Sequence, residues 1–363
     1  MLDTTLGLNA MKGRKQKGLS LVELMIALAL SSTLIFGLFT IYLDSTQTSR
    51  MSNSLARVQE SGRIGFDIMA RDMRAVGYQG CADPDDVTMN IIANNPPSSD
   101  FMENTLRGWE VTGANWANGT EYGGTSIETS ARIGSDVIAI QRGVNTDIAV
   151  YDKMNAANAN IKVSGGNINL FSKNDIVMIS DCESADLFRI SSEPTSGAWA
   201  HANNVNAGNF LSQAYNEKSS ILRFTASVYY VADTNRDDAQ GAPIYALYRA
   251  SNNLALAGTT FQIDELVEGV ESLQILYGEL LPTNNIRYVP ADEAGLDMKR
   301  VVAIRLGVLV SDSEKTRDNN DTASYDLPGE TIVPAGAAGA VTHAEDQRLR
   351  RTFTTTVALR NRD

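Results

Sequence analysis

An apolar run from Leu19 to Leu43, "LSLVELMIALALSSTLIFGLFTIYL", most constrains what this chain can fold into. As a helix it is long enough to span a bilayer, which takes about 20 apolar residues. The run contains one charged residue, Glu23. A charge at the centre of a bilayer costs roughly 2.5–3.5 kcal/mol on insertion scales, and such residues are normally retained for a partner or a task. The presence of Glu23 in this apolar run therefore requires a functional or structural explanation.

A basic leader precedes the apolar run, with positive charges at Lys12, Arg14, Lys15 and Lys17. Positive charge holds that end of a membrane segment in the cytoplasm, so we expect the rest of the chain outside it. No Ala-x-Ala-like cleavage site follows the run, so we expect the membrane segment to survive processing. Met11 would give a more compact leader, and the true start is left open between Met1 and Met11.

The helical pattern continues beyond the membrane segment. Small and apolar residues recur at steps of three and four and trace one face, at Leu55, Val58, Gly62, Phe66, Met69, Met73 and Val76. We predict one helix of roughly 55 residues, about 80 Å long, which ends near Gly77, Gly80 and Cys81. Its second half packs on the chain's own head, with a partner helix as the alternative.

Beyond residue 80 the sequence changes to short β-rich apolar runs separated by polar loops, which is typical of antiparallel sheet. Residues 264–278 are ambiguous and are predicted as a short helix leading into a strand that ends at Tyr277. The Asn-, Gly- and Ser-rich stretches look like elaborations of a smaller sheet core. The predicted strands are 135–140, 175–180, 187–191, 224–232, 243–249, 301–310 and 352–359.

The formal net charge of −12 argues against nucleic acid as a partner. The chain has two cysteines, Cys81 and Cys182, an even number beside an export-like start. We therefore predict a disulfide between them, formed outside the cytosol. Closing a loop of about 100 residues is worth roughly 4.7 kcal/mol in the chain-entropy model.

The start of the chain resembles the class III signal of type IV pilins and pseudopilins: a basic leader, Gly18, an apolar run, and Glu five residues after the Gly. The resemblance implies cleavage by a prepilin peptidase after Gly18 and methylation of the new amine on Leu19, where family members usually have Phe. It also implies that Glu23 engages the N-terminal amine of a neighbouring subunit. The alternative is that Glu23 is tolerated near the helix start by the helix dipole and headgroup water.

Length and four later segments are similar to the large minor pilins of the PilW type, relatives of pseudopilin J of type II secretion. These segments are 70–81, 180–191, 265–278 and 351–362, and Cys81 and Cys182 fall inside two of them. The implied fold is α+β and type IV pilin-like, a long N-terminal helix on a mainly antiparallel sheet with large loop insertions. The implied organisation is a cleaved leader (1–18), a helix (19–78) and a head (79–363).

The resemblance implies a scaffold and no enzyme. The protein would sit in the bacterial inner membrane with a periplasmic head, and at the pilus tip after assembly. Its partners would be other minor pilins, the major pilin, the prepilin peptidase, the inner-membrane assembly platform and a tip adhesin. Removing a leader of net charge +3 from a chain of −12 leaves about −15, which would steer partner choice.

Signals for other chemistry are weak. The stretch "DTNRDD" copies the first alternating ligands of a calcium loop, with Asp233, Asn235, Asp237 and Asp238, but lacks its Gly and Glu. A polar turn is the alternative reading, and calcium stays open as a cofactor, with no other expected. His201 and His343 lie in polar contexts and are predicted as surface residues. Four tyrosines in two predicted strands are expected to be mostly core residues: Tyr229, Tyr230, Tyr245 and Tyr248.

The sequence favours a minor pilin that helps to start and cap a type IV pilus. One alternative is a type II secretion component like pseudopilin J, which has the same architecture. Another, from a different class, is a single-pass anchored envelope enzyme or receptor.

Overall fold

The computed structural model describes residues 18–83, 86–94, 105–118, 125–165, 168–252, 261–339 and 341–360. Most of the predicted leader therefore lies outside the described residues, as does the choice between Met1 and Met11. The chain divides into two compact units, residues 1–52 and 53–363. The helix α1, Leu21–Met73, has residues in both units.

In the first unit, α1 has the composition of a membrane segment. An 18-residue window has a mean hydropathy of 2.2 with none of it buried, and α1 is the one helix among the described residues long and apolar enough to cross a membrane. Large apolar side chains such as Leu24, Ile35 and Phe36 are exposed along it. Because exposing this surface to water would be costly, lipid or other subunits must cover it.

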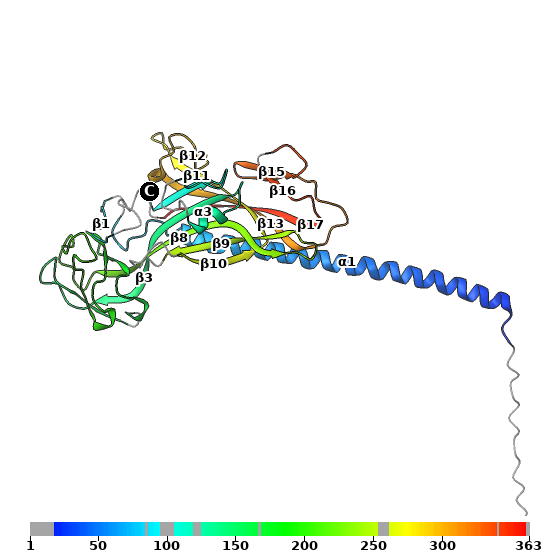
Figure 1. Ribbon diagram of the computed structural model, residues 1–363, viewed down its shortest axis with the longest axis horizontal. Coiled ribbons are helices and arrows are strands. Elements are labelled where there is room, and N and C mark those ends of the chain that lie inside the picture. Colours follow the sequence, from blue (N-terminus) through cyan, green and yellow to red (C-terminus); the bar gives the residue numbers. More distant parts are fainter. Residues whose placement is uncertain are drawn as a thin grey trace, which may run out of the picture. The chain divides into compact units, whose positions relative to one another are not determined.

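In the second unit, the C-terminal part of α1 packs on the head, with its buried residues between Ser54 and Met73. The buried positions Val58, Gly62, Gly65 and Met69 follow the three- and four-residue spacing read from the sequence. This face lies against β9 (Pro243–Asn252), β10 (Phe261–Glu268) and β17 (Arg348–Ala358), as Figure 1 shows.

In the part of the head that the structure describes, the strands form three sheets, which are antiparallel apart from the pairs β1–β6 and β15–β16. The largest has ten strands and follows the order β1-β6-β5-β8-β3-β4-β7; off this path, β9 pairs with β8, β10 pairs with β9, and β2 pairs with β3. The second follows the order β12-β11-β13-β17, and the third is β14-β15-β16. The α+β fold class is confirmed: a long N-terminal helix on a mostly antiparallel sheet.

The remaining elements are α3 (Ser126–Ser130), three short 3₁₀ helices and fourteen strands of the described chain. The 3₁₀ helices are Ile168–Leu170, Pro194–Ser196 and Met298–Arg300. The strands are β1 (Asn90–Ile91), β2 (Leu106–Glu110), β3 (Asp136–Val150), β4 (Ile161–Ser164), β5 (Ile176–Ser180), β6 (Ala185–Arg189), β7 (Ala198–Trp199), β8 (Ser220–Asp237), β11 (Val270–Leu280), β12 (Ile286–Val289), β13 (Val301–Lys315), β14 (Tyr325–Leu327), β15 (Glu330–Pro334) and β16 (Thr342–His343).

Two long strands, β3 and β8, contribute residues to several hydrophobic cores of the described chain. One core joins α1 to the strands near it, with Met69, Tyr229, Leu247 and Leu306 among its members. A second core, around Trp199, is built largely from residues between 148 and 221. This span includes Asn-, Gly- and Ser-rich stretches expected as elaborations, 145–167 and 192–218, and also the predicted strands 175–180 and 187–191, which form β5 and β6 of the largest sheet.

The short helix predicted at the start of 264–278 is wrong. The chain instead forms β10, a turn at Gly269, and β11. Gly269 has a φ of 88°, and a Cβ there would lie 2.3 Å from the carbonyl oxygen of Ser311. A side chain is excluded on both counts, so a glycine is required at this turn, where the chain passes from the sheet of β10 to the sheet of β11.

Candidate functional site

The first turn of α1 places Glu23 at the third helical position. The Ser20 side-chain oxygen accepts a hydrogen bond from the Glu23 backbone N–H at 3.2 Å, and the Ser20 carbonyl accepts one from Leu24 N–H at 3.1 Å. Ser20 is therefore the N-cap, with the Ser-x-x-Glu spacing of a capping box. A carboxylate in a first turn is favoured by the free N–H groups there.

Gly18 lies just before this turn and is not required by the chain's own packing. A Cβ built on it meets no atom within 4 Å. Its φ also lies outside the left-handed region, where glycine is preferred. Among the described residues, neither packing nor backbone conformation therefore requires a glycine at this position.

The helix and the head are joined by small residues and by charge. A Cβ at Gly62 would lie 2.6 Å from the Phe353 ring, so the glycine lets β17 pack directly on α1. Arg57 on α1 donates two hydrogen bonds to Asp312, at 2.7 and 3.3 Å. The buried Asp72 accepts from Arg142 Nη2 at 2.7 Å and from the Tyr229 hydroxyl.

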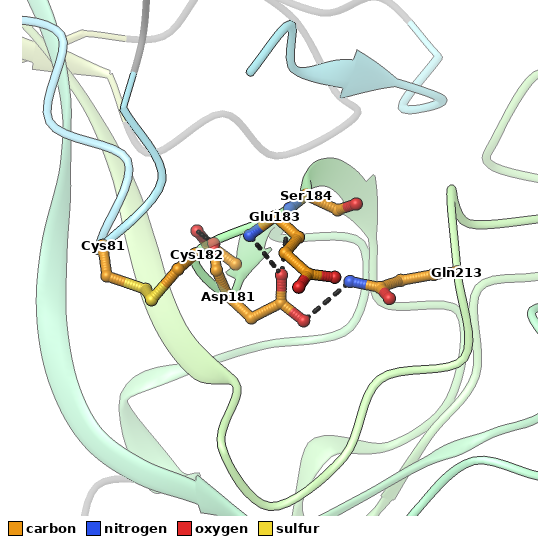
Figure 2. The surroundings of a disulfide bond; sticks show 7 residues. Cys81, Asp181, Cys182, Glu183, Ser184 and Gln213 are labelled. Atoms are coloured by element: carbon orange, nitrogen blue, oxygen red, sulfur yellow. Dashed lines mark hydrogen bonds between the residues drawn. A yellow bond between two sulfur atoms is a disulfide. The ribbon is translucent and has the colours of Figure 1, made fainter. Parts of the chain in front are cut away.

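The disulfide between Cys81 and Cys182 is present, with Cα atoms 4.8 Å apart (Figure 2). It ties the segment that follows α1 to the turn between β5 and β6. Figure 2 shows Asp181 ordering this turn: one carboxylate oxygen accepts from Glu183 and Ser184 N–H, both at 2.9 Å, and the other from Gln213. Both cysteines are exposed.

A buried charge cluster fixes the start of β17, and the sequence analysis missed it. Arg350 has no exposed side-chain surface and donates two 3.0 Å hydrogen bonds to the two carboxylate oxygens of Glu271. Its other terminal nitrogen reaches Asp346 at 2.8 Å and Asp321 at 3.3 Å. Burial alone would lower the pKa of Arg350, but the attraction of Glu271 and Asp346 outweighs it and raises that pKa.

The neighbouring Arg348 extends this cluster to the β8–β9 hairpin. It donates a 2.8 Å hydrogen bond to Asp238. Burial would raise the pKa of Asp238, but the Ala242 N–H and the Arg348 guanidinium outweigh it and lower the pKa to about 2. Asp238, predicted as a weak calcium ligand, therefore has an arginine as its counterion.

The rest of the calcium candidate forms a turn. Asp233 accepts from the backbone N–H of Asn235, which has a φ of 56°. Among the described residues, no group of three or more His, Cys, Asp or Glu side chains is arranged to hold a metal ion. The structure thus does not gather Asp233, Asn235, Asp237 and Asp238 into a ligand set.

The predicted surface location of the two histidines is wrong. His201 is 3% and His343 1% exposed. His201 Nε2 contacts the Ala159 carbonyl at 3.0 Å, and His343 contacts the carbonyls of Ala344 and Ala323 at 2.9 and 2.8 Å. Both tie loops together through backbone carbonyls, so their role here is structural.

The two adjacent tyrosines of β8 are both buried, because this part of the strand is covered on both faces and alternation does not place either one on the exterior. Tyr229 and Tyr230 are buried, and Tyr230 stacks on Tyr248 with ring centroids 5.7 Å apart. Tyr245 lies under the Arg132 guanidinium at 3.9 Å. These contacts are internal to the head.

The buried carboxyl group of Asp136 lies beside the carboxyl group of Glu110. Asp136 on β3 is paired directly with Glu110 on β2, and it accepts from Ile275 N–H at 2.6 Å. Burial, followed by repulsion from Glu110, raises the pKa of Asp136 well above its ordinary value. Asp136 thus holds a proton in the folded chain over a pH range where it is ionised in the unfolded chain.

This pair predicts a pH dependence of stability. Because the folded-state pKa of Asp136 is raised, its contribution is fully present below its unfolded pKa of about 4 and is lost as pH rises through the folded value. Asp136→Asn keeps an acceptor for Ile275 and has no proton to lose. We expect the free energy of unfolding of the variant, relative to that of the wild type, to be higher at pH 8 than at pH 5 by about 1 kcal/mol or more. Urea denaturation at the two pH values measures this difference. An equal difference at both pH values would contradict this.

Two family models match the chain. Residues 228–361 match "Type IV Pilus-assembly protein W" and residues 13–39 match the "Prokaryotic N-terminal methylation motif". Among solved structures, a type IV-like pilin from Thermus thermophilus is similar, with 16% identity and a TM-score of 0.21, covering 38% of this chain and 78% of its own. No curated protein matches significantly. The first model contains β9 to β17 with the Arg350 cluster, and the second contains Gly18 and Glu23.

Proposed function

We propose that this protein acts in the tip complex that starts and caps a type IV pilus. The two family matches, which support a type IV minor pilin, are the basis of the proposal. Involvement in type IV pilus assembly follows from the matches themselves. The methylation motif and apolar helix fit anchoring in the inner membrane with a periplasmic head. Such a role is structural, without catalysis.

The proposed maturation begins with prepilin peptidase cleavage after Gly18. The observation that supports it best is the first turn of α1: an unconstrained Gly18, the Ser20 cap, and Glu23 at the head of an exposed apolar helix. Cleavage leaves the amine of Leu19 four residues before the Glu23 carboxylate. N-methylation of that amine, as the motif match suggests, keeps its positive charge.

Glu23 then acts in assembly. A lone carboxylate and a lone ammonium are each costly in an apolar medium, and bringing them together in two adjacent subunits removes most of that cost. In the free subunit, the helix N-terminus makes Glu23 tolerable. The two explanations weighed from the sequence thus describe two stages, before and after subunits meet.

The head supplies the rigid part of this role. Glycine packing, the Arg57–Asp312 pair and the buried Asp72 fix α1 within the head unit, so a force on the helix is transmitted to the sheet. The proposed partners are other minor pilins, the major pilin, the assembly platform and a tip adhesin.

The experiment is a gene deletion complemented with variants. Deletion is expected to reduce surface pili, counted by electron microscopy, while the cellular amount of major pilin is unchanged. Complementation with Glu23→Gln should leave the pilus number near that of the deletion strain, because the charge is lost. Glu60→Gln, an exposed glutamate later on α1, is the matched control and should restore pili. Normal pilus numbers after deletion would refute the priming role, and equal rescue by both variants would refute the role of Glu23.

A further inference from the structure

Four arginines line one pocket at the C-terminal end of α1, in a protein of net charge −12. Arg71 lies in the last turn of α1 and Arg74 directly after it, Arg142 lies on β3, and Arg360 lies two residues after the end of β17. The cavity has a volume of about 480 Å³, and Tyr78 and Val144 form part of its wall.

The backbone fixes these elements to one another. Arg360 N–H donates to the Arg74 carbonyl at 3.4 Å, and Gly143 N–H donates to the Tyr78 carbonyl at 2.7 Å. A Cβ on Gly143 would lie 2.9 Å from that same carbonyl oxygen, so the wall of the pocket is tightly packed. The arginines are therefore carried by anchored backbone.

The carboxylate next to the pocket, Asp72, already has hydrogen-bond partners. One of its oxygens accepts from Arg142 and the other accepts from the Tyr229 hydroxyl. Arg71, Arg74 and Arg360 have no carboxylate within ion-pair distance among the residues that the structure describes. Like charges held close together repel, and the negative end of the helix dipole offsets this only in part.

We propose that this pocket is a docking site for an acidic peptide segment of a partner subunit. Guanidinium groups present forked donors that match carboxylates in two-point contacts, and the tyrosine and valine walls suit the aliphatic part of such side chains. Charge complementarity carries the choice of partner: four arginines, three of them without a carboxylate partner among the described residues, would attract an acidic segment of a neighbour. The identity of the neighbour as another pilin rests on the proposed function, but the binding of an acidic peptide does not.

The test uses the full chain in detergent micelles, with acetylated and amidated hexaglutamate as the probe in isothermal titration calorimetry. Replacing the three arginines that lack an acid partner, with Arg71→Gln, Arg74→Gln and Arg360→Gln combined, is expected to weaken binding by at least about tenfold. Arg142 is left in place because it holds Asp72. The control combines Arg63→Gln and Arg351→Gln, both exposed arginines outside the pocket, and should bind as the wild type does.

Three results would overturn the proposal: no binding of hexaglutamate, equal binding by the triple variant and the control, or displacement of the peptide by an equal concentration of inorganic phosphate. The last would make the pocket a small-anion site. Circular dichroism of the triple variant verifies that it folds. None of these results bears on pilus number, so failure here is distinct from failure of the proposed function.

Discussion

Arg350→Ala is expected to lower the free energy of unfolding by about 3–5 kcal/mol, the usual cost of removing one partner from a buried ion pair. The side chain is fully buried, and its loss leaves Glu271, Asp321 and Asp346 without their shared counterion. The largest effect is expected at Glu271. Burial would raise the pKa of Glu271, but the attraction of Arg350 outweighs burial and lowers that pKa. The measurement is urea denaturation of the full chain in micelles, followed by circular dichroism.

The next residue supplies the matched control. Arg351 is exposed on the opposite face of β17, so Arg351→Ala should change the free energy of unfolding by no more than about 0.5 kcal/mol. Arg350→Lys keeps the charge but lacks the fork that meets both oxygens of Glu271, and should fall between the two. If Arg350→Ala and Arg351→Ala are equally stable, the cluster does not anchor β17.

Replacing both cysteines by serine is expected to cost about 2–5 kcal/mol of stability. The bond joins residues 101 apart in sequence, and the chain-entropy model gives roughly 4.7 kcal/mol for a loop of that length. Since both cysteines are exposed, a reductant should produce a similar loss in the wild type. The readout is again the free energy of unfolding, with and without dithiothreitol.

The double variant also serves as the control, because dithiothreitol has no bond to break in it. Asp181→Ala, which removes the acceptor from the Cys182 turn but leaves the bond, should cost less than losing the disulfide. Wild-type stability that is unchanged by full reduction would contradict a stabilising role for this bond.

The sequence predicts those parts of the fold in which apolar residues recur at a regular spacing or gather in short runs. Steps of three and four mark the face of α1 that meets the head, and short apolar β-rich runs between polar loops locate β3, β5, β6, β8, β9, β13 and β17. Strands β3 and β8 extend beyond their predicted bounds, to Val150 and Asp237, because pairing continues where the residues become polar. Apolar patterning therefore locates these strands better than it locates their ends.

Residues 264–278 show where pattern fails. All residues from Val270 to Ile275 are buried, although they include Glu271, Ser272 and Gln274, so the polar residues of β11 do not mark a solvent-facing side. The apolar residues Val267, Val270 and Leu273 recur at steps of three, which also fits a helix. The strand conformation of β11 is determined by its pairing with β13, which is distant in sequence, and by the turn at Gly269, whose φ is positive.

The same reason explains what the sequence analysis missed at the site. Arg350 and His343 look like surface residues, since charged and imidazole side chains usually are. Their partners come from segments far apart in sequence or from backbone carbonyls, and neither leaves a local motif. By contrast, Gly18, Leu19, Ser20 and Glu23 lie within six residues, so their spacing is legible without a structure.

The central claim is that the mature protein starts at Leu19 and keeps its apolar helix. Mass spectrometry of the N-terminal peptide, from cells with and without the prepilin peptidase, tests it most directly. With the peptidase, the account predicts a first residue of Leu19 carrying one added methyl group, and without it an uncut leader. A peptidase-independent N-terminus, or a mature chain that begins at any other residue, would contradict the account.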